Sequence, residues 1–116
     1  MLLRLILILT FTAVAGCSSR PPPIGRGLPI SFGPTPPFND RVVKRFPAGS
    51  DETKLLAELR REHFTVMENR DPSSRYRLSA SYEISSLVCK DVWTIEWTAE
   101  RGKIKEIWGE SQDLCL

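Results

Sequence analysis

Three cysteines are the residues of this 116-residue chain with the clearest chemical potential. A deprotonated cysteine is a nucleophile and a soft metal ligand near neutral pH. Cys17 stands alone near the start, whereas Cys89 and Cys115 lie 26 positions apart near the end. Two cysteines at that spacing with no histidine nearby do not make a four-ligand metal site. We therefore expect no metal, and we expect a disulfide between Cys89 and Cys115 if the chain folds in an oxidising compartment.

Catalytic side chains are sparse in the sequence. The single histidine, His63, stands at the expected end of a helix, where histidine tolerates the left-handed backbone that often ends helices. The sequence has no Gly-x-Ser-x-Gly pattern and no glycine-rich phosphate loop. Neighbouring carboxylates such as Asp51 and Glu52 suit the positive end of a helix dipole. We therefore predict that the chain has no catalytic residues and no dissociable cofactor.

The charge of the chain argues against nucleic acid as a partner. Sixteen basic and 14 acidic side chains leave a formal net charge of +2. Binding to nucleic acid would need lysines and arginines gathered into a dense stripe, which this sequence lacks. A smaller basic set, Arg70, Arg75 and Arg77, surrounds a predicted loop and is our candidate interaction surface, although simple solvation also explains it.

The first sixteen residues have the pattern of a secretory signal peptide. Arg4 supplies a positive charge, an apolar run follows from Leu5 to Val14, and small residues close the segment. A membrane-spanning helix needs about 20 apolar residues, and this run is about half that length. The pattern predicts that residues 1–16 are a leader that is removed.

The sequence Val14-Ala15-Gly16-Cys17 resembles the lipobox of bacterial lipoproteins. The resemblance implies cleavage between Gly16 and Cys17, a diacylglycerol on the Cys17 thiol and usually a third acyl chain on the new amino terminus. Anchoring by several chains is strong, because each buried methylene contributes about 0.8 kcal/mol. Ser18 follows in place of the aspartate that retains such proteins at the inner membrane. We therefore expect an anchor in the outer membrane, facing the periplasm, if the cell has two membranes; an ordinary signal peptide is the alternative.

Residues 17–38 are expected to form a tether. Ser18–Phe38 holds seven prolines, three glycines and no acidic residue, a composition that offers little apolar surface for folding. Extended polyproline at about 3.1 Å per residue would reach on the order of 60 Å, so the domain could stand off the membrane. A second interpretation takes Pro34–Pro37 as a ligand for an aromatic groove in another protein.

Residues 39–116 are predicted to form one compact α+β domain. Leu55, Leu56 and Leu59 recur at helical spacing, which predicts a helix over 51–62 with Ser50 as its N-cap. Tyr76 begins ten residues of strict apolar and polar alternation. The expected strands are 40–46, 64–68, 76–84, 92–98 and 103–108, which places one amphipathic helix on an antiparallel sheet of three to five strands in the order β-α-β-β-β-β.

The last two strands are expected to form a hairpin around residues 99–102. Pairing Thr98 with Lys103 would set Trp93 opposite Trp108 and place Trp93, Trp97 and Trp108 on one face, where they would form much of the core. In that register Glu106 lies on the apolar face and Ile107 on the polar one. A β-bulge near Lys105 would correct both positions.

In size and layered architecture the chain is similar to small envelope lipoproteins, including the accessory subunit of the outer-membrane β-barrel assembly machine. That subunit's family usually opens with two helices, whereas the pattern here predicts one. The resemblance implies a lipid-anchored, non-catalytic domain that contacts the membrane through its anchor and binds another envelope protein. Two other functions stay open. An aromatic patch on the free sheet face would favour a ligand-binding or inhibitor module, and a pocket enclosing His63 and a carboxylate would favour a small enzyme.

Overall fold

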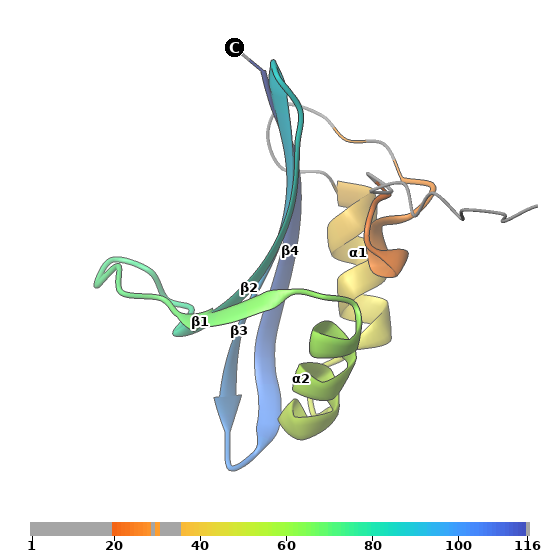
Figure 1. Ribbon diagram of the computed structural model, residues 1–116. Coiled ribbons are helices and arrows are strands. Elements are labelled where there is room, and N and C mark those ends of the chain that lie inside the picture. Colours follow the sequence, from red (N-terminus) through yellow and green to blue (C-terminus); the bar gives the residue numbers. More distant parts are fainter. Residues whose placement is uncertain (1–19, 29, 31–35, 116) are drawn as a thin grey trace, which may run out of the picture.

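The chain folds into two helices and one sheet, as the computed structural model shows for residues 20–28, 30 and 36–115. The strands are all antiparallel and lie in the order β1-β2-β3-β4, which confirms the α+β class (Figure 1). The leader and Cys17 lie outside the described residues. The elements in chain order are the short 3-10 helix η1 (Pro23–Gly25), α1 (Pro36–Arg45), α2 (Glu52–Arg61), β1 (Thr65–Glu68), β2 (Leu78–Ser85), β3 (Cys89–Glu100) and β4 (Lys103–Cys115).

The molecule has two layers, because both helices cover the same face of the sheet (Figure 1). The core lies between these layers, and its largest fully buried side chains include Trp93, Trp97 and Phe38. None of the helices in the described part of the chain is long and apolar enough to span a bilayer. The other face of the sheet is left without a helix over it in that same part of the chain.

The predicted strand at 40–46 is wrong, because residues 40–45 belong to α1 and the N–H of Phe46 still bonds to the carbonyl of Val42. Phe38, Val42 and Phe46 are four residues apart and all three are buried, which is the spacing of one helix face. The sequence prediction assigns Phe38 to the tether, and without Phe38 the helical spacing is not visible. Pro36 and Pro37 open the helix, where a missing backbone N–H costs nothing. Two helices therefore precede the sheet.

Part of the expected tether packs against the domain. Ile24 is buried in the core, and its backbone N–H donates a hydrogen bond of 2.8 Å to Glu62 Oε1. The guanidinium of Arg41, on α1, donates to the backbone carbonyl of Arg26 at 2.7 Å. Glu62 is itself buried and pairs with Arg45 at 3.1 Å. The packed part of the chain thus begins well before residue 39.

Helix α2 confirms the predicted amphipathic pattern, with Leu55 and Leu59 buried. Its N-cap position is taken by Asp51 rather than Ser50. His63 has φ 67° and so adopts the left-handed conformation that was predicted. The N–H of His63 bonds to the carbonyl of Arg60 at 3.0 Å, and the N–H of Phe64 bonds to that of Leu59 at 2.9 Å. These two backbone hydrogen bonds together form the Schellman motif that ends helices. The backbone of His63 therefore has a structural role.

The hairpin of β3 and β4 has a different register from the expected one. Glu100 pairs with Lys103 around a two-residue turn, and Arg101 and Gly102 both have positive φ. The predicted bulge is confirmed, because Ala99 pairs with Ile104 and Thr98 pairs with Glu106, leaving Lys105 between them. The bulge moves Glu106 off the core face and Ile107 onto it.

The new register separates the three tryptophans. Trp93 and Trp97 are 1% and 0% exposed in the core. Trp108 pairs with Glu96, and alternation along β3 puts both on the face away from the helices. The expectation that all three tryptophans share one face is therefore wrong for Trp108. The shorter turn moves its partner by two residues and the extra residue moves it by one, so Trp108 lies opposite Glu96 instead of Trp93.

Candidate interaction surface

The open face of the sheet is the face away from the two helices, and in the described part of the chain no helix covers it. It is polar at its centre, where Thr94, Glu96 and Glu110 lie around the half-buried Trp108. Burial raises the pKa of the Glu96 carboxyl, and the neighbouring carboxylate of Glu110 raises that pKa further. A carboxyl held among like charges and partly out of water favours a cationic neighbour. This face therefore suits contact with positive charge.

The rim of the open face carries two ion pairs. Lys90 lies 3.1 Å from Glu83, and Arg75 lies 3.3 Å from Glu106. All four side chains are about half exposed or more. Surface pairs of this kind contribute about 0 to 1 kcal/mol each, so they shape the charge pattern of the rim more than they stabilise the fold.

The loop between β1 and β2 projects from the sheet on the side away from the helices (Figure 1). Its conformation is held by local hydrogen bonds: the Asn69 side-chain amide donates to Ser74 Oγ at 2.9 Å, and Asp71 Oδ1 accepts from the Ser73 backbone and hydroxyl. The bonds from Ser73 lower the pKa of the Asp71 carboxyl. The loop is an ordered platform for the arginines that it carries.

The structure distributes the three predicted arginines instead of gathering them. Arg70 lines a hollow of about 610 Å³ on the open face, together with Met67 and Glu96. Arg77 lines a different hollow of about 340 Å³, near the start of α2. Arg75 is bound to Glu106 and lies over the Tyr76 ring, 5.3 Å from its centroid. Only Arg70 therefore belongs to the hollow on the open face.

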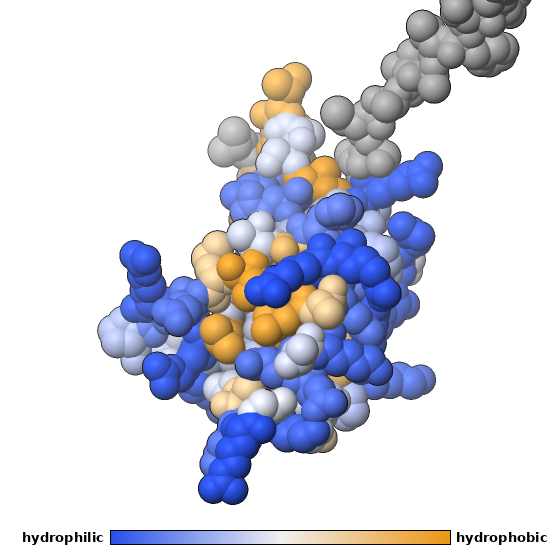
Figure 2. All heavy atoms as spheres, turned by 60° about the horizontal axis from the view of Figure 1, so that its bottom comes forward, coloured by the Kyte–Doolittle hydropathy of each residue, from blue (hydrophilic) through white to orange (hydrophobic). Residues whose placement is uncertain are grey.

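The smaller hollow lies between Glu52 at the start of α2, Leu78 of β2 and the β3–β4 turn at Gly102. Figure 2 turns this lower end of the molecule forward and shows apolar side chains gathered between charged ones. Below the hollow, the buried Trp97 donates its indole N–H to Glu52 Oε2 at 2.9 Å. The volume is at the low end for a small-molecule site.

His63 and a carboxylate do line one hollow, of about 460 Å³, with Ser81 and Tyr82. His63 and Glu83 are both exposed there, and Glu83 is the partner of Lys90. Within the described residues His63 makes no side-chain hydrogen bond, so it is not joined to Ser81 as a general base is to its nucleophile. The hollow thus brings together residue types that a small enzyme would need, and no side-chain hydrogen bond of His63 joins them in the described part of the chain.

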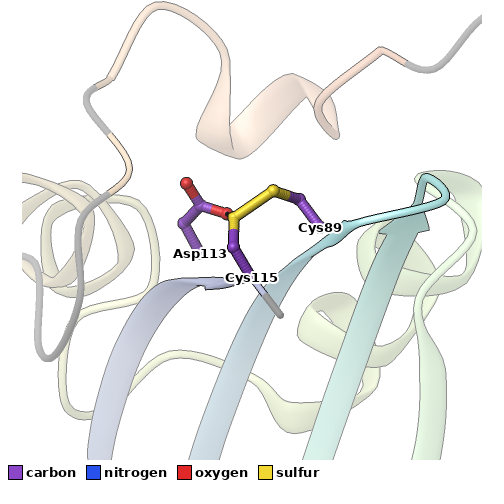
Figure 3. Close-up of side chains that lie close together, drawn as sticks. All are labelled: Cys89, Asp113 and Cys115. Atoms are coloured by element: carbon purple, nitrogen blue, oxygen red, sulfur yellow. Dashed lines mark hydrogen bonds between the residues drawn. A yellow bond between two sulfur atoms is a disulfide. The ribbon is translucent and has the colours of Figure 1, made fainter.

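A disulfide closes the far end of the sheet, where Cys89 and Cys115 are directly paired on β3 and β4. Figure 3 shows Asp113 beside the two sulfurs. These three side chains are close enough to share an ion, but sulfurs joined in a disulfide offer no thiolate. The group is therefore not a metal site while the bond is closed.

Sequence reasoning missed the carboxylate pair next to this disulfide. Asp91 and Asp113 are opposite each other on β3 and β4. Desolvation raises the pKa of Asp91, and the hydrogen bond and negative charge of Asp113 raise it further. The signal was present, since each aspartate lies two residues inside a cysteine, and antiparallel pairing of Cys89 with Cys115 forces the aspartates together.

An apolar tip at the same end was also missed. Leu87 is 98% exposed, Val88 is 61% exposed and Leu114 is 48% exposed. Leu87 and Val88 form the turn between β2 and β3, and Leu114 lies beside it in the last residues of β4. The signal was an apolar pair at a position where hairpins usually carry Asn, Asp or Gly.

Compared with known protein families, with curated proteins and with solved structures, this chain matches none of them.

Proposed function

We propose that this protein is a lipid-anchored, non-catalytic lipoprotein of the bacterial cell envelope whose small domain binds another envelope protein. The observation that carries the proposal is the division of the three cysteines. Cys89 and Cys115 are paired at disulfide distance, which suits an exported domain. Cys17 is then the one cysteine left, and it stands in the Val14-Ala15-Gly16-Cys17 sequence that resembles a lipobox. The outer membrane, facing the periplasm, is the proposed location in a cell with two membranes.

The order of the elements supports this proposal. Two helices followed by an antiparallel sheet is similar to the arrangement that opens the accessory subunit of the outer-membrane β-barrel assembly machine. The predicted single helix had been the difference between the two, and α1 supplies the second helix. The resemblance concerns architecture, and the partner is proposed here only as an envelope protein.

The open sheet face is the proposed site for that partner. Glu96 and Glu110 give it negative charge at the centre, and Trp108 between them offers apolar area and a π face. A complementary partner surface would present lysine or arginine side chains. Of the three candidate arginines, only Arg70 reaches a hollow on this face, where it lies with Glu96; Arg75 is paired with Glu106 at the rim and Arg77 lines another hollow. The charge that selects the partner is therefore the acidic charge at the centre of the face.

Fatty-acid labelling in bacterial cells tests the anchor. The wild-type chain should incorporate radioactive palmitate and lose its leader, and Cys17→Ser should do neither. Cys115→Ser is the matched control, because it removes a thiol of the same chain and should still be labelled. Labelling that survives in Cys17→Ser would overturn the anchor assignment.

Photo-crosslinking from the open face tests the partner site. A photoreactive amino acid at Thr94 should yield a discrete adduct with one envelope protein, and the same amino acid at Lys54, on the exposed side of α2, should not. Adding Glu96→Lys and Glu110→Lys should abolish the Thr94 adduct while leaving the melting temperature unchanged. Equal adducts from both positions would contradict the assignment of this face.

A further inference from the structure

The packing of the N-terminal segment leaves very little free chain before the domain. Pro22 and Ile24 are fully buried, and the Tyr82 hydroxyl donates a hydrogen bond of 3.3 Å to the backbone carbonyl of Arg20. Arg20 follows Cys17 by three positions. Even a fully extended chain spans only about 10–11 Å over three residues. An acylated Cys17 would therefore hold the domain at the bilayer surface, in place of the stand-off of tens of ångströms that a 22-residue tether allows.

The short connection also selects which part of the domain meets the bilayer. Tyr82, which holds Arg20, is on β2, and the chain reaches Leu87 five residues later, about 16 Å along the strand. The contact between Tyr82 and Arg20 thus lies in the half of the sheet that carries the apolar tip of Leu87, Val88 and Leu114. Figure 1 shows the turn between β2 and β3 and the end of β4 at that end, opposite the β3–β4 turn.

The apolar tip is held firmly in place. The backbone N–H of Ser86 donates to the carbonyl of Cys89 at 2.7 Å, and the Ser86 hydroxyl bonds to the same carbonyl at 3.0 Å. The disulfide joins Cys89 to Cys115 directly below the turn. A hairpin whose shape is fixed can keep leucine and valine in water without collapsing onto the domain. Such exposed apolar groups mark a contact with a partner or a membrane.

The charge of residues 20–28, the segment nearest the proposed anchor, favours a bilayer as the surface that contacts the domain. Residues 20–28 carry two exposed arginines, Arg20 and Arg26, and no acidic residue. Phosphate groups of phospholipids attract arginines at a membrane surface, while apolar side chains enter the layer beneath them. Basic side chains on the anchored segment, together with an apolar tip in the same half of the sheet, are the combination that suits this boundary.

We propose that the domain docks on the same bilayer that holds its lipid anchor, with Leu87 and Val88 inserted at the interface and Arg20 and Arg26 against phospholipid phosphates. This inference rests on the proposed lipidation of Cys17. In this orientation β3 and β4 run away from the membrane. The β3–β4 turn at Arg101 then lies about 26 Å farther along β3 than Trp93 and faces the periplasmic space.

Fluorescence quenching by lipids tests the docking. The full chain, processed in cells, is placed in vesicles of phosphatidylethanolamine and phosphatidylglycerol that contain phosphatidylcholine with a nitroxide on its acyl chain. An encoded fluorescent amino acid replaces Leu87 in one sample and Arg101 in another. Quenching should be several-fold stronger at position 87 than at position 101. Val88→Asp should reduce it to the level at position 101, with an unchanged melting temperature because the side chain is exposed.

Flotation of the vesicles separates the two ways of failing. Protein that floats with the vesicles but is quenched equally at both positions overturns the docking and leaves the anchor intact. In that case the apolar tip would be a contact for a protein instead of the bilayer. Protein that does not float with the vesicles overturns the anchor, and the docking with it.

A second variant lengthens the connection. Insertion of 20 glycine and serine residues between Ser19 and Arg20 should weaken the quenching at position 87, because a longer connection lowers the effective concentration of the tip at the surface. Undiminished quenching there would overturn the role of the short connection.

Discussion

The backbone of Gly25 packs directly against the indole ring of Trp93, with no room for a side chain between them. A Cβ at position 25 would be 2.6 Å from Trp93 Nε1 and 2.9 Å from Cδ1. These distances are shorter than any side chain tolerates, and Trp93 is itself fully buried on β3. The absence of a side chain at residue 25 is therefore what lets η1 close over this part of the sheet. The contact makes the N-terminal segment part of the folded domain.

Gly25→Val should lower the free energy of unfolding by about 1–3 kcal/mol, because the added atoms must displace η1 or the indole. Urea denaturation followed by tryptophan fluorescence measures this. Arg26→Val is the matched control, since its side chain is exposed, and it should change stability by less than about 0.5 kcal/mol. Equal effects of the two substitutions would show that η1 does not pack on Trp93.

Replacing both Cys89 and Cys115 by serine should lower the free energy of unfolding by about 3.5 kcal/mol, the loop entropy expected for cysteines 26 positions apart. In a domain of this size the melting temperature should fall by more than about 10 °C. Thermal melts with and without a reducing agent check the cause. The reducing agent should lower the wild-type melting temperature to that of the double variant and leave the variant unaffected. An unchanged melting temperature of the wild type in the reducing agent would contradict the disulfide.

Asp91→Asn should raise the melting temperature at pH 7 and lose this advantage in acid. The folded state raises the pKa of Asp91 through desolvation and through Asp113, so it favours the protonated form. That contribution is fully present below the unfolded-state pKa and is lost as the pH rises through the higher folded-state value. Asparagine imitates the protonated form at every pH. Melts from pH 3 to pH 8 should show the two curves meeting at the acidic end.

Asp71→Asn should behave in the opposite way and serves as the control for Asp91. Hydrogen bonds from Ser73 lower the pKa of Asp71, so its contribution is present above the unfolded-state pKa and is lost as the pH falls through the lower folded-state value. The substitution should therefore cost stability at pH 7 and little near pH 3. The same sign of pH dependence in both variants would refute the assigned environments.

Trp97→Ala should cost about 3–5 kcal/mol, whereas Trp108→Ala should cost roughly 1 kcal/mol. Trp97 is 0% exposed and bonds to Glu52, while Trp108 is half-buried on the open face. Urea denaturation of the two single variants measures the difference. Comparable losses would mean that both indoles lie in the core. That result would fit the register expected from the sequence, in which Trp108 lies opposite Trp93.

Local features of the domain could be predicted from the sequence. The alternation that begins at Tyr76 identified β2, because a half-buried strand must alternate. His63 was predicted as a helix ending, because backbone geometry there depends on the residue itself and its immediate neighbours. The bulge at Lys105 followed from the conflict between Glu106 and Ile107, which only one extra residue could resolve. Each of these features depends on a short stretch of chain.

The sequence by itself thus determined the α+β class, helix α2, the sheet and the pairing of the two distant cysteines. The tertiary structure alone decided three other features. It made α1 a helix, since Phe38 counts as a core residue only when β4 lies across from it. It drew residues 20–28 onto the domain, because Ile24 needs the buried carboxylate of Glu62. It placed Trp108 on the open face, because a register is set by the length of the turn and the partner strand together, and a shift of one residue exchanges the two faces.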